Sequence, residues 1–520
     1  MNQSFMESVK ATINTGKFNE AVTENGALGF RTTGSNLLDI NFAVASLRKA
    51  TTEEILDKWV KAYFENPKLA VKWLFFAGDI RGGLGERRLF RTILTYICET
   101  NTELAEILIP YIPLYTRWDY VLDSLDNPEL QETILKFIET TLLEDLDGRN
   151  EEKPISLLAK WLPSVNSKNK ETRRKALIIC NYLNWSEKQY RKTLADLRTY
   201  LGVVEVRMCA NKWNEIDYSA VPSKANLIYK NAFIEHDKER REAFLESLAK
   251  GETKINASVL YPHDIAHKAT HFGWYNVGVN EKDATVIELW KALPDYVQGN
   301  SNTIVVSDGS GSMFDEIGGS NISAIEVAAS LAIYFSEHQS GQFKDNFITF
   351  SENPQLVDLS NCNDIYDKLR TTYAYDECSN TNIAKVFDLL LTTAVQNHIS
   401  QKEFVDNVLI ISDMEFDYMT RANYNGTFEA PSKKLFEEIA EKYAEAGYKL
   451  PRLIFWNVNS RTGTIPVIEN ELGVALVSGF SPVIAKMVLS GKTDPFEVLL
   501  DTLNDKRYDA IDEAISEVLD

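Results

Sequence analysis

The sequence contains no run of about 18 apolar residues, which is the length that a membrane-spanning helix needs. Its opening segment, MNQSFMESVKATINTG, also lacks the apolar stretch of a secretory signal peptide. We therefore expect a cytoplasmic protein without a membrane partner. Among 520 residues there are only five cysteines and no Cys-x-x-Cys pair, which argues against both a disulfide framework and a zinc ribbon.

Positive charge is also scarce, because the formal net charge is −20 at pH 7. A protein that coats nucleic acid along its whole length would not have this balance. The charge is uneven, however. Residues 151–250 contain 19 Lys and Arg against 13 Asp and Glu, a net of +6, whereas residues 301–520 contain 16 against 34, a net of −18. We expect any polyanion to meet the middle of the chain.

A chain of this length is expected to form two to four domains of about 100–200 residues each. Residues 1–35 are polar and are predicted to be an N-terminal arm. Over residues 36–296, apolar side chains recur at spacings of three and four, and the connections are short and polar. This pattern predicts stacked helix pairs, an all-α array of the solenoid type.

The pattern changes over residues 297–520, where short β-rich runs alternate with helical ones. The runs are near-continuous in Val, Ile and Phe, as in parallel strands covered on both faces, and they span 302–308, 347–351, 405–413, 451–458 and 474–479. They predict a doubly wound, Rossmann-like α/β domain. Ligands bind such sheets at the carboxyl ends of the strands, and two of these ends carry an aspartate, Asp308 and Asp413.

The first of these strand ends, in residues 308–312, places one carboxylate and two hydroxyls on a Gly-containing turn. It matches the DxSxS motif and so resembles the MIDAS-type metal site of von Willebrand A domains. That resemblance implies direct ligation by Ser310, Ser312 and Thr381, with Asp308 and Asp413 acting directly or through water. Because Mg²⁺ prefers oxygen ligands in octahedral geometry, the expected cofactor is a divalent cation, Mg²⁺ or else Mn²⁺.

Two alternatives compete for the same residues. One is a flexible Gly/Ser turn that holds no metal. The other is a serine hydrolase, because Ser307 to Gly311 differs by one residue from the G-x-S-x-G nucleophile elbow. The hydrolase also needs a histidine after Asp413, and none follows His398. The metal site is favoured by three pieces of the motif, namely residues 308–312, Thr381 and Asp413. They occur in the right order, and each lies at a predicted strand end or helix start.

The most distinctive N-terminal segment is Asp79 to Phe90, where three glycines within four positions predict a tight turn between helices. It resembles the RxGxGER-x-LF turn of TROVE-module, Ro-type RNA-binding proteins. Those proteins join a ring of HEAT-like helical repeats to a C-terminal von Willebrand A domain, which is the order predicted here. Further segments resemble a poorly characterised Ro-like subgroup, namely Arg117-Trp118-Asp119, Val221-Pro222-Ser223, Pro262-His263-Asp264 and Ser412 to Phe416.

The resemblance implies RNA as a ligand, either single-stranded ends or small noncoding RNA, with no DNA specificity. Basic residues that could contact phosphates are Arg81, Arg87, Arg88, Arg91, Lys168, Lys170, Arg173, Arg174, Lys175, Arg191 and Lys192. Lys188 and Arg198 extend this region, and Trp161, Trp185 and Tyr190 lie within it. Cations beside aromatic rings are how proteins hold single strands. The alternative is a solvated basic helix face whose aromatic side chains belong to the core.

We therefore predict a non-catalytic RNA-binding or ribonucleoprotein scaffold with a divalent-metal site. The alternative is a protein-interaction adaptor, in which the metal grips an acidic side chain of a partner. His263, His267 and His271 are spaced by four, so they would share one face of a helix. Because the HExxH glutamate is absent, we expect them to pack at a domain junction rather than bind zinc.

Overall fold

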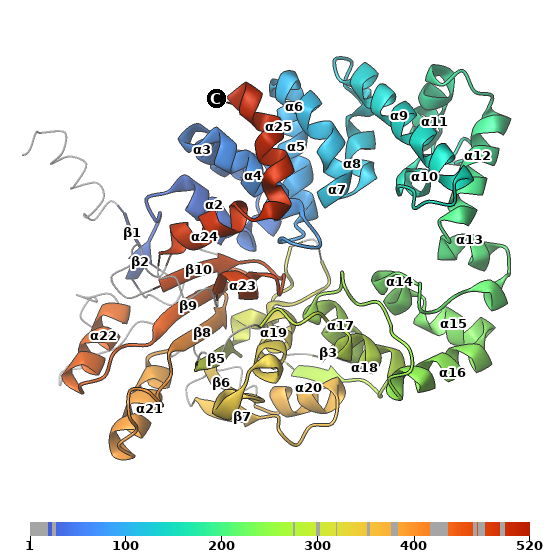
Figure 1. The fold of residues 1–520 in the computed structure, drawn as a ribbon. Helices are drawn as coiled ribbons and strands as arrows, with labels where there is room; N and C mark the ends of the chain where they lie inside the picture. Colours follow the sequence, from blue (N-terminus) through green and yellow to red (C-terminus); the bar gives the residue numbers. More distant parts are fainter. Residues whose placement is uncertain are drawn as a thin grey trace, which may run out of the picture. The chain divides into compact units, whose positions relative to one another are not determined.

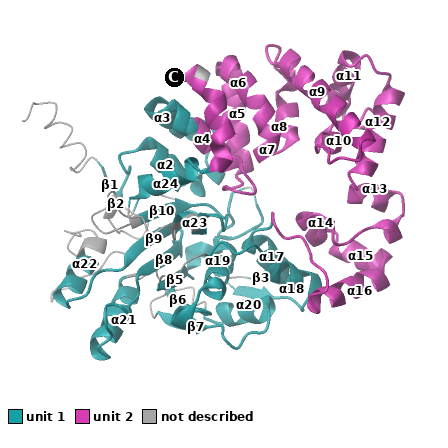
Figure 2. Ribbon diagram, in the orientation of Figure 1, with its two compact units in different colours: residues 1–70, 260–505 teal, residues 71–259, 506–520 magenta. Residues whose placement is uncertain are grey.

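The computed structural model describes residues 19–22, 28–273, 276–297, 302–318, 320–350, 354–375, 383–415, 435–460, 465, 474–488 and 494–519. Contacts divide the chain into two compact units (Figure 2). Unit 1 contains residues 1–70 and 260–505, and unit 2 contains residues 71–259 and 506–520. The two units are defined by their contacts and not by independent folding. The predicted domain boundaries at residues 36 and 297 therefore stay predictions.

Unit 1 is built on a six-stranded sheet with the order β10-β9-β8-β5-β6-β7 (Figure 1). Its strands are β5 (Thr303–Asp308), β6 (Asn346–Phe350), β7 (Gln355–Asp358), β8 (Asn407–Ser412), β9 (Arg452–Asn457) and β10 (Val474–Ser478). All neighbours are parallel except β6 and β7, which are antiparallel. The five predicted strands are all present. The prediction missed the edge strand β7, whose four residues include a single buried side chain and so form no apolar run.

Helices cover both faces of this sheet, which explains the near-continuous apolar strands. On one face, Val306 and Phe455 belong to a core cluster that includes Phe387 of α21 (Ile383–Gln396). On the other face, Trp456 meets Phe335 of α19 (Ala324–His338) edge-on, with ring centroids 5.5 Å apart. Alternate residues of each strand therefore enter different cores, and the predicted doubly wound α/β architecture is confirmed.

The helices of unit 1 are α2 (Asn36–Ala43), η1 (Ser46–Arg48), α3 (Thr52–Glu65), α17 (Pro262–Ala269), α18 (Ala284–Lys291), η5 (Gly311–Phe314), α19 (Ala324–His338), η6 (Gly341–Phe343), α20 (Ile365–Tyr373), α21 (Ile383–Gln396), α22 (Leu435–Glu445), α23 (Ile484–Val488) and α24 (Pro495–Leu503). Two small hairpins pair β1 (Glu20–Val22) with β2 (Leu28–Phe30) and β3 (Thr270–Gly273) with β4 (Asn276–Val279). The predicted polar arm thus contains a strand pair, while residues 1–18 lie outside the described residues.

The N-terminal segment of unit 1 packs against the β10 edge of the sheet. The backbone N–H of Ala45 donates to Ser478 Oγ at 3.0 Å, and Asn457 Nδ2 donates to the carbonyl of Phe42 at 3.1 Å. These contacts fix α2 beside the outermost strand. Because an uncovered edge strand can pair with another chain, α2 protects the sheet at this side.

Unit 2 is a succession of helices in which most pack against their neighbours in sequence. After α4 (Pro67–Gly78), they are α5 (Arg87–Thr100), α6 (Thr102–Leu108), η2 (Ile109–Tyr111), α7 (Ile112–Tyr115), α8 (Trp118–Asp123), η3 (Ser124–Asp126), α9 (Gln131–Asn150), α10 (Leu158–Trp161), α11 (Lys170–Tyr182), α12 (Glu187–Tyr200), α13 (Val204–Cys209), η4 (Trp213–Glu215), α14 (Ser223–Ile228), α15 (Lys230–His236), α16 (Lys238–Ala249), η8 (Lys506–Tyr508) and α25 (Asp509–Leu519). Unit 2 is therefore the all-α part of the predicted fold. In the described part of the chain, no helix combines the length and apolarity that crossing a bilayer requires.

The glycine-rich turn of unit 2 is held by residues from the far end of the chain. Asp79 is fully buried and pairs with Arg507, whose Nη2 donates to Oδ1 at 2.8 Å. Tyr508 donates its hydroxyl to Asp79 Oδ2 at 3.2 Å and stacks on Tyr115, with ring centroids 5.7 Å apart. A buried carboxylate is costly unless it is paired, so this contact ties the turn to η8.

Two of the three glycines in this turn are required by close packing rather than by backbone angles. A Cβ on Gly83 would overlap the carbonyl oxygen of Phe76, and one on Gly82 would overlap the side chain of Arg507. Only Gly85 has a left-handed backbone, with φ of 69°. The expected unusual backbone angles are therefore found at Gly85 alone.

This packing predicts a difference between two glycine substitutions in unit 2. Gly83→Ala should destabilise the protein by roughly 1–3 kcal/mol, the usual range for overpacking, because backbone must move to admit the methyl group. Gly148→Ala lies within α9, where the nearest atom to the new Cβ is the flexible Cγ2 of Ile155 at 3.1 Å. It should leave stability unchanged or raise it. Thermal denaturation checks this, and equal melting temperatures for the two variants would contradict it.

Candidate functional site

The carboxyl ends of β5 and β8 form the candidate site of unit 1. The two strands are adjacent and parallel, with Ser307 opposite Ile411. Strand order reverses between them, which is where open α/β sheets bind ligands. Asp308 is the last residue of β5, and Asp413 follows the last residue of β8. Both carboxylates are buried, at 1% and 0% exposure. The sheet therefore brings these two predicted site residues to one edge.

The turn after β5 wraps around the Asp308 carboxylate. Its Oδ1 accepts from the backbone N–H of Ser310 at 2.9 Å, and its Oδ2 accepts from Ser412 Oγ at 2.7 Å. The hydroxyls of Ser310 and Ser312 lie 3.1 Å apart. Ser310 is buried, whereas Ser312 is half-buried. Four of the five predicted metal-site residues are thus described at this strand edge, while Thr381 lies outside the described residues.

The electrostatics of this strand edge disfavour two negative charges. Burial and the neighbouring charge of Asp413 raise the pKa of Asp308 from an ordinary 3.8 to about 7, although hydrogen bonds from Ser412 and Ser310 oppose the rise. A divalent cation would offset this repulsion, and two carboxylates with two hydroxyls suit a hard cation such as Mg²⁺. In the described part of the chain, no three His, Cys, Asp or Glu side chains group to hold a metal, so a site here depends on the serines.

Sequence reasoning missed two polar residues that support the edge. Ser412 donates to Asp308 and accepts from the N–H of Met414 at 3.0 Å. Glu415 is fully buried, its N–H donates to Asp413 at 3.3 Å, and its Oε1 accepts from Ser460 Oγ at 3.4 Å. Met414 between them has a φ of 65°, a left-handed value that is uncommon for a residue with a long side chain. Both residues lie in the Ser412 to Phe416 segment noted in the sequence, but neither periodicity nor motif spacing assigns them a supporting role.

Three of the predicted RNA-binding residues in unit 2 are paired with acids. Arg91 contacts Asp123 at 2.9 Å and Asp119 at 3.4 Å. Arg174 pairs with Asp126 and Glu171. Lys175 donates to the carbonyl of Leu122 at 2.7 Å and lies 3.6 Å from Asp126. Acidic side chains of α8 and η3 thus pair with basic side chains of both α5 and α11.

The other predicted RNA-binding residues, Arg88 among them, are exposed. Seven of these residues have no side-chain partner in the described part of the chain, namely Arg81, Arg87, Lys168, Lys170, Arg173, Arg191 and Lys192. Most lie on α11 and α12 or just before them. A set of unneutralised cations therefore remains on consecutive helices of unit 2.

The nearby aromatic and basic residues have mixed roles. Tyr190 is fully buried and donates to the carbonyl of Pro163 at 3.0 Å, so it belongs to the core and cannot stack on a base. Arg198 donates to the carbonyls of Ala159 and Leu162, so it stabilises α10 and is not free for phosphate. The guanidinium of Arg117 lies over the ring of Trp161, 4.3 Å from its centroid. Of the two interpretations of the aromatic side chains, the one in which they belong to the core holds for Tyr190.

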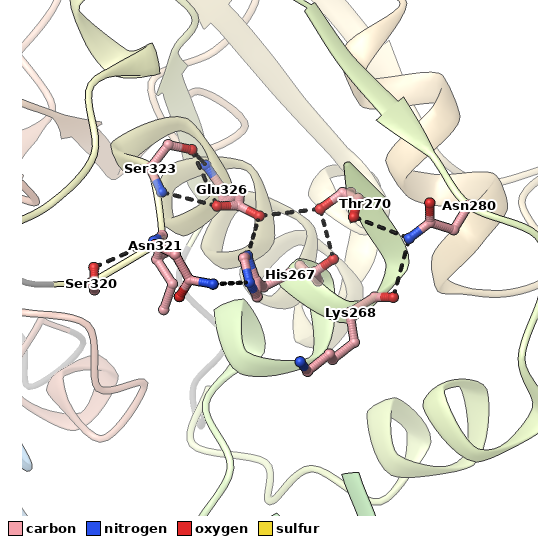
Figure 3. Close-up of polar contacts among 10 residues, drawn as sticks. His267, Lys268, Thr270, Asn280, Ser320, Asn321, Ser323 and Glu326 are labelled. Carbon is pink, nitrogen blue, oxygen red and sulfur yellow. Dashed lines mark hydrogen bonds and ion pairs between the residues drawn. The ribbon is translucent and has the colours of Figure 1, made fainter. Parts of the chain in front are cut away.

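The three spaced histidines do not share a helix face. α17 ends at Ala269, and His271 lies in β3, where its Nδ1 is 2.8 Å from Asn280 Oδ1. His263 is buried against Phe480. His267 contacts the buried carboxylate of Glu326 through Nδ1 at 2.9 Å and Asn321 through Nε2 at 3.1 Å (Figure 3). The shared-face prediction fails because the helix stops two residues before His271.

The raised pKa of Asp308 predicts how stability depends on pH in metal-free protein. The folded chain holds this proton more tightly than the unfolded chain, so the stabilising contribution is complete below about pH 4 and is lost as pH rises through about 7. With EDTA present, the melting temperature should fall across this interval more steeply for wild type than for Asp308→Asn. The exposed Glu53→Gln variant should keep the wild-type profile. Parallel profiles for wild type and Asp308→Asn would refute this account.

Comparisons with known proteins give two family matches, one curated relative and several similar solved structures. Residues 166–302 match a domain of unknown function, DUF2828, and residues 302–514 match another, DUF7788. The chain is 28% identical to "Uncharacterized protein L728" of Acanthamoeba polyphaga mimivirus, over 93% of this chain and 87% of the relative. Among solved structures, the Deinococcus radiodurans RO (RSR) protein is similar at a TM-score of 0.44 and 12% identity, covering 88% of this chain and 100% of that one.

Proposed function

We propose that the chain is a non-catalytic RNA-binding scaffold of the ribonucleoprotein type, with a divalent-metal site in unit 1. The observation that carries the RNA part is a set of exposed cations in unit 2 that have no side-chain partner in the described part of the chain, namely Lys168, Lys170, Arg173, Arg191 and Lys192. Folded proteins commonly pair surface cations or leave them scattered. Here they gather on α11, α12 and the segment before α11, in the one region with a net charge of +6.

RNA suits these residues because phosphates are their complementary ligand. Arginine presents a planar fork of donors to phosphate oxygens, and lysine supplies a mobile point charge. Binding by such groups is driven by counterion release and therefore weakens as salt rises. Unit 1 carries most of the negative charge, since residues 301–520 have a net charge of −18. We therefore assign RNA to unit 2 alone.

The metal part of the proposal rests on the paired carboxylates. Asp308, Asp413, Ser310 and Ser312 would hold Mg²⁺ or Mn²⁺, with Thr381 as a further ligand. The bound cation would supply positive charge against two buried carboxylates. Ser412 keeps the Asp308 carboxylate in place, since it donates to Oδ2 at 2.7 Å. Of these four described residues, Asp308, Ser310 and Asp413 are buried and Ser312 is half-buried, so the group is exposed at Ser312.

That exposed side favours a second candidate function, the protein-interaction adaptor. A cation held by buried carboxylates and reached past Ser312 can take one more oxygen ligand from outside, and an acidic side chain of a partner is such a ligand. The two candidates differ in one observable property. An adaptor captures an acidic peptide only with the cation present, whereas RNA binding by unit 2 does not require the cation.

The metal assignment predicts the effect of removing both carboxylates. Asp308→Asn with Asp413→Asn should abolish calorimetric binding of Mg²⁺ and Mn²⁺ by the full chain, because two serine hydroxyls alone do not hold a hard divalent cation. Asp358→Asn removes an exposed carboxylate of β7 and should bind as wild type does. Metal binding that survives the double substitution would rule out this site.

The RNA assignment predicts different behaviour for unpaired and paired arginines of α11 and α12. Arg173→Gln together with Arg191→Gln should weaken binding of a single-stranded RNA oligonucleotide at low salt and leave the melting temperature unchanged. Arg174→Gln, which removes an ion pair with Asp126, should change RNA affinity little. Filter binding from about 50 to about 200 mM salt should show a steep fall for wild type. A flat salt response, or equal effects of the two substitutions, would contradict phosphate binding by these side chains.

A further inference from the structure

A pocket of about 500 Å³ lies in unit 1 beside the turn that follows β5. Its walls include Phe272 of β3, Phe314 at the end of η5, the adjacent Asp315 and Glu316, and Asn321. Gly311 also lines it, so the pocket borders the DxSxS turn. Its volume lies in the range of sites that take small molecules or single side chains. Nothing in the metal or RNA proposals uses these residues.

The charge of the pocket selects for a cation. Asp315 and Glu316 are both exposed at its wall. No lysine or arginine is among the described residues that line it. A hollow lined by charges of one sign raises the local concentration of ions of the opposite sign and repels those of the same sign. Phosphate groups are therefore disfavoured here, in contrast to the basic helices of unit 2.

The two aromatic residues that line the pocket, Phe272 and Phe314, favour a planar cation over a compact one. Phe272 has 40% of its surface exposed, which is high for a large apolar side chain, and Phe314 is half-buried. An aromatic face attracts cations, and arginine in addition stacks its planar guanidinium on the ring. A carboxylate beside the ring accepts two parallel hydrogen bonds from the same group. Ring and carboxylate together fit a guanidinium better than a compact ammonium.

A hydrogen-bond network anchored on the buried Glu326 orients the amide of Asn321 (Figure 3). Glu326 is fully buried, and its carboxylate accepts from Thr270 Oγ1 at 3.1 Å and from the N–H of Ser323 at 2.9 Å. The Nδ1 of His267 lies 2.9 Å from Oε1 of this carboxylate, which accepts from it. An amide nitrogen only donates, so Asn321 Nδ2 donates to His267 Nε2 at 3.1 Å.

This chain of hydrogen bonds determines what Asn321 presents to a ligand. Because its Nδ2 donates to His267, its Oδ1 remains as an acceptor at the wall of the pocket. The pocket then offers an amide oxygen, exposed carboxylates and aromatic surface. All of these complement a group that carries several N–H donors and a positive charge.

We propose that this pocket binds the guanidinium of an arginine side chain in a basic segment of a partner protein. The guanidinium packs against Phe272 and donates to Glu316 and Asn321. The occupant is a peptide rather than RNA, because a base stacked on Phe272 would bring its phosphate toward two carboxylates. This site is separate from the proposed metal ligands, and its test does not depend on the metal or on RNA.

The experiment measures fluorescence anisotropy of a labelled glycine-serine peptide with one central arginine, titrated with the full chain. The matched ligand carries citrulline, which has the same shape and no charge. We expect the citrulline peptide to bind at least about tenfold more weakly, since a charge-assisted pair contributes more than about 1.4 kcal/mol. Equal affinity for the two peptides would overturn the proposal.

Three variants and one control locate the binding. Glu316→Gln, Phe272→Ala and Asn321→Leu should each weaken the arginine peptide several-fold, with melting temperatures close to wild type because all three side chains are exposed. Glu53→Gln removes an exposed carboxylate on α3 and should have no effect. Wild-type affinity in both Glu316→Gln and Phe272→Ala would overturn the assignment. So would binding of a single-stranded RNA that Phe272→Ala abolishes and Glu316→Gln strengthens.

Discussion

The repulsion between the buried carboxylates of Asp308 and Asp413 is the interaction around which the strand edge of unit 1 is organised. Parallel strands in register carry both side chains to one place, and helices on both faces of the sheet keep water away from them. The pKa of Asp308 rises as a result. Ser412 and the N–H of Ser310 offset part of that cost, and a cation would offset more. The same burial that makes the sheet stable therefore makes this edge a receptive site for positive charge.

In unit 2 the charge of a buried carboxylate is offset differently, because Asp79 is neutralised by Arg507. Here the cation belongs to the chain, so the result is a fixed structure rather than a ligand site. The pair draws η8 against the glycine-rich turn, and Gly82 leaves space for the side chain of Arg507. This turn thus owes Gly82 and Gly83 to packing and Gly85 to its left-handed backbone. Its exposed arginines, Arg81 and Arg87, are free of that role.

Local patterns predicted most of the fold, and contacts between distant residues account for what they missed. The strands of the sheet could be predicted because each is a buried apolar run, and Asp308 with Asp413 because strand ends face one edge. β7 could not, since a half-exposed edge strand has no such run. Arg507 could not be assigned to Asp79, because no periodicity links residues 428 positions apart. The supporting roles of Ser412 and Glu415 are likewise recognised only once the strands are paired.

Counting charges along the sequence also misses contacts between residues that are distant in the chain. These contacts affect where RNA would bind. The net charge of +6 in residues 151–250 omits acids that precede the segment in sequence but contact it in space. Asp126 pairs with Arg174 and lies near Lys175, so two of the counted cations are offset. The surplus that remains is carried by residues such as Arg173 and Arg191, on neighbouring helices. A basic segment is therefore a weaker indicator of a polyanion site than a basic surface. Whether a basic segment forms a basic surface depends on whether each of its cations is paired with an acid.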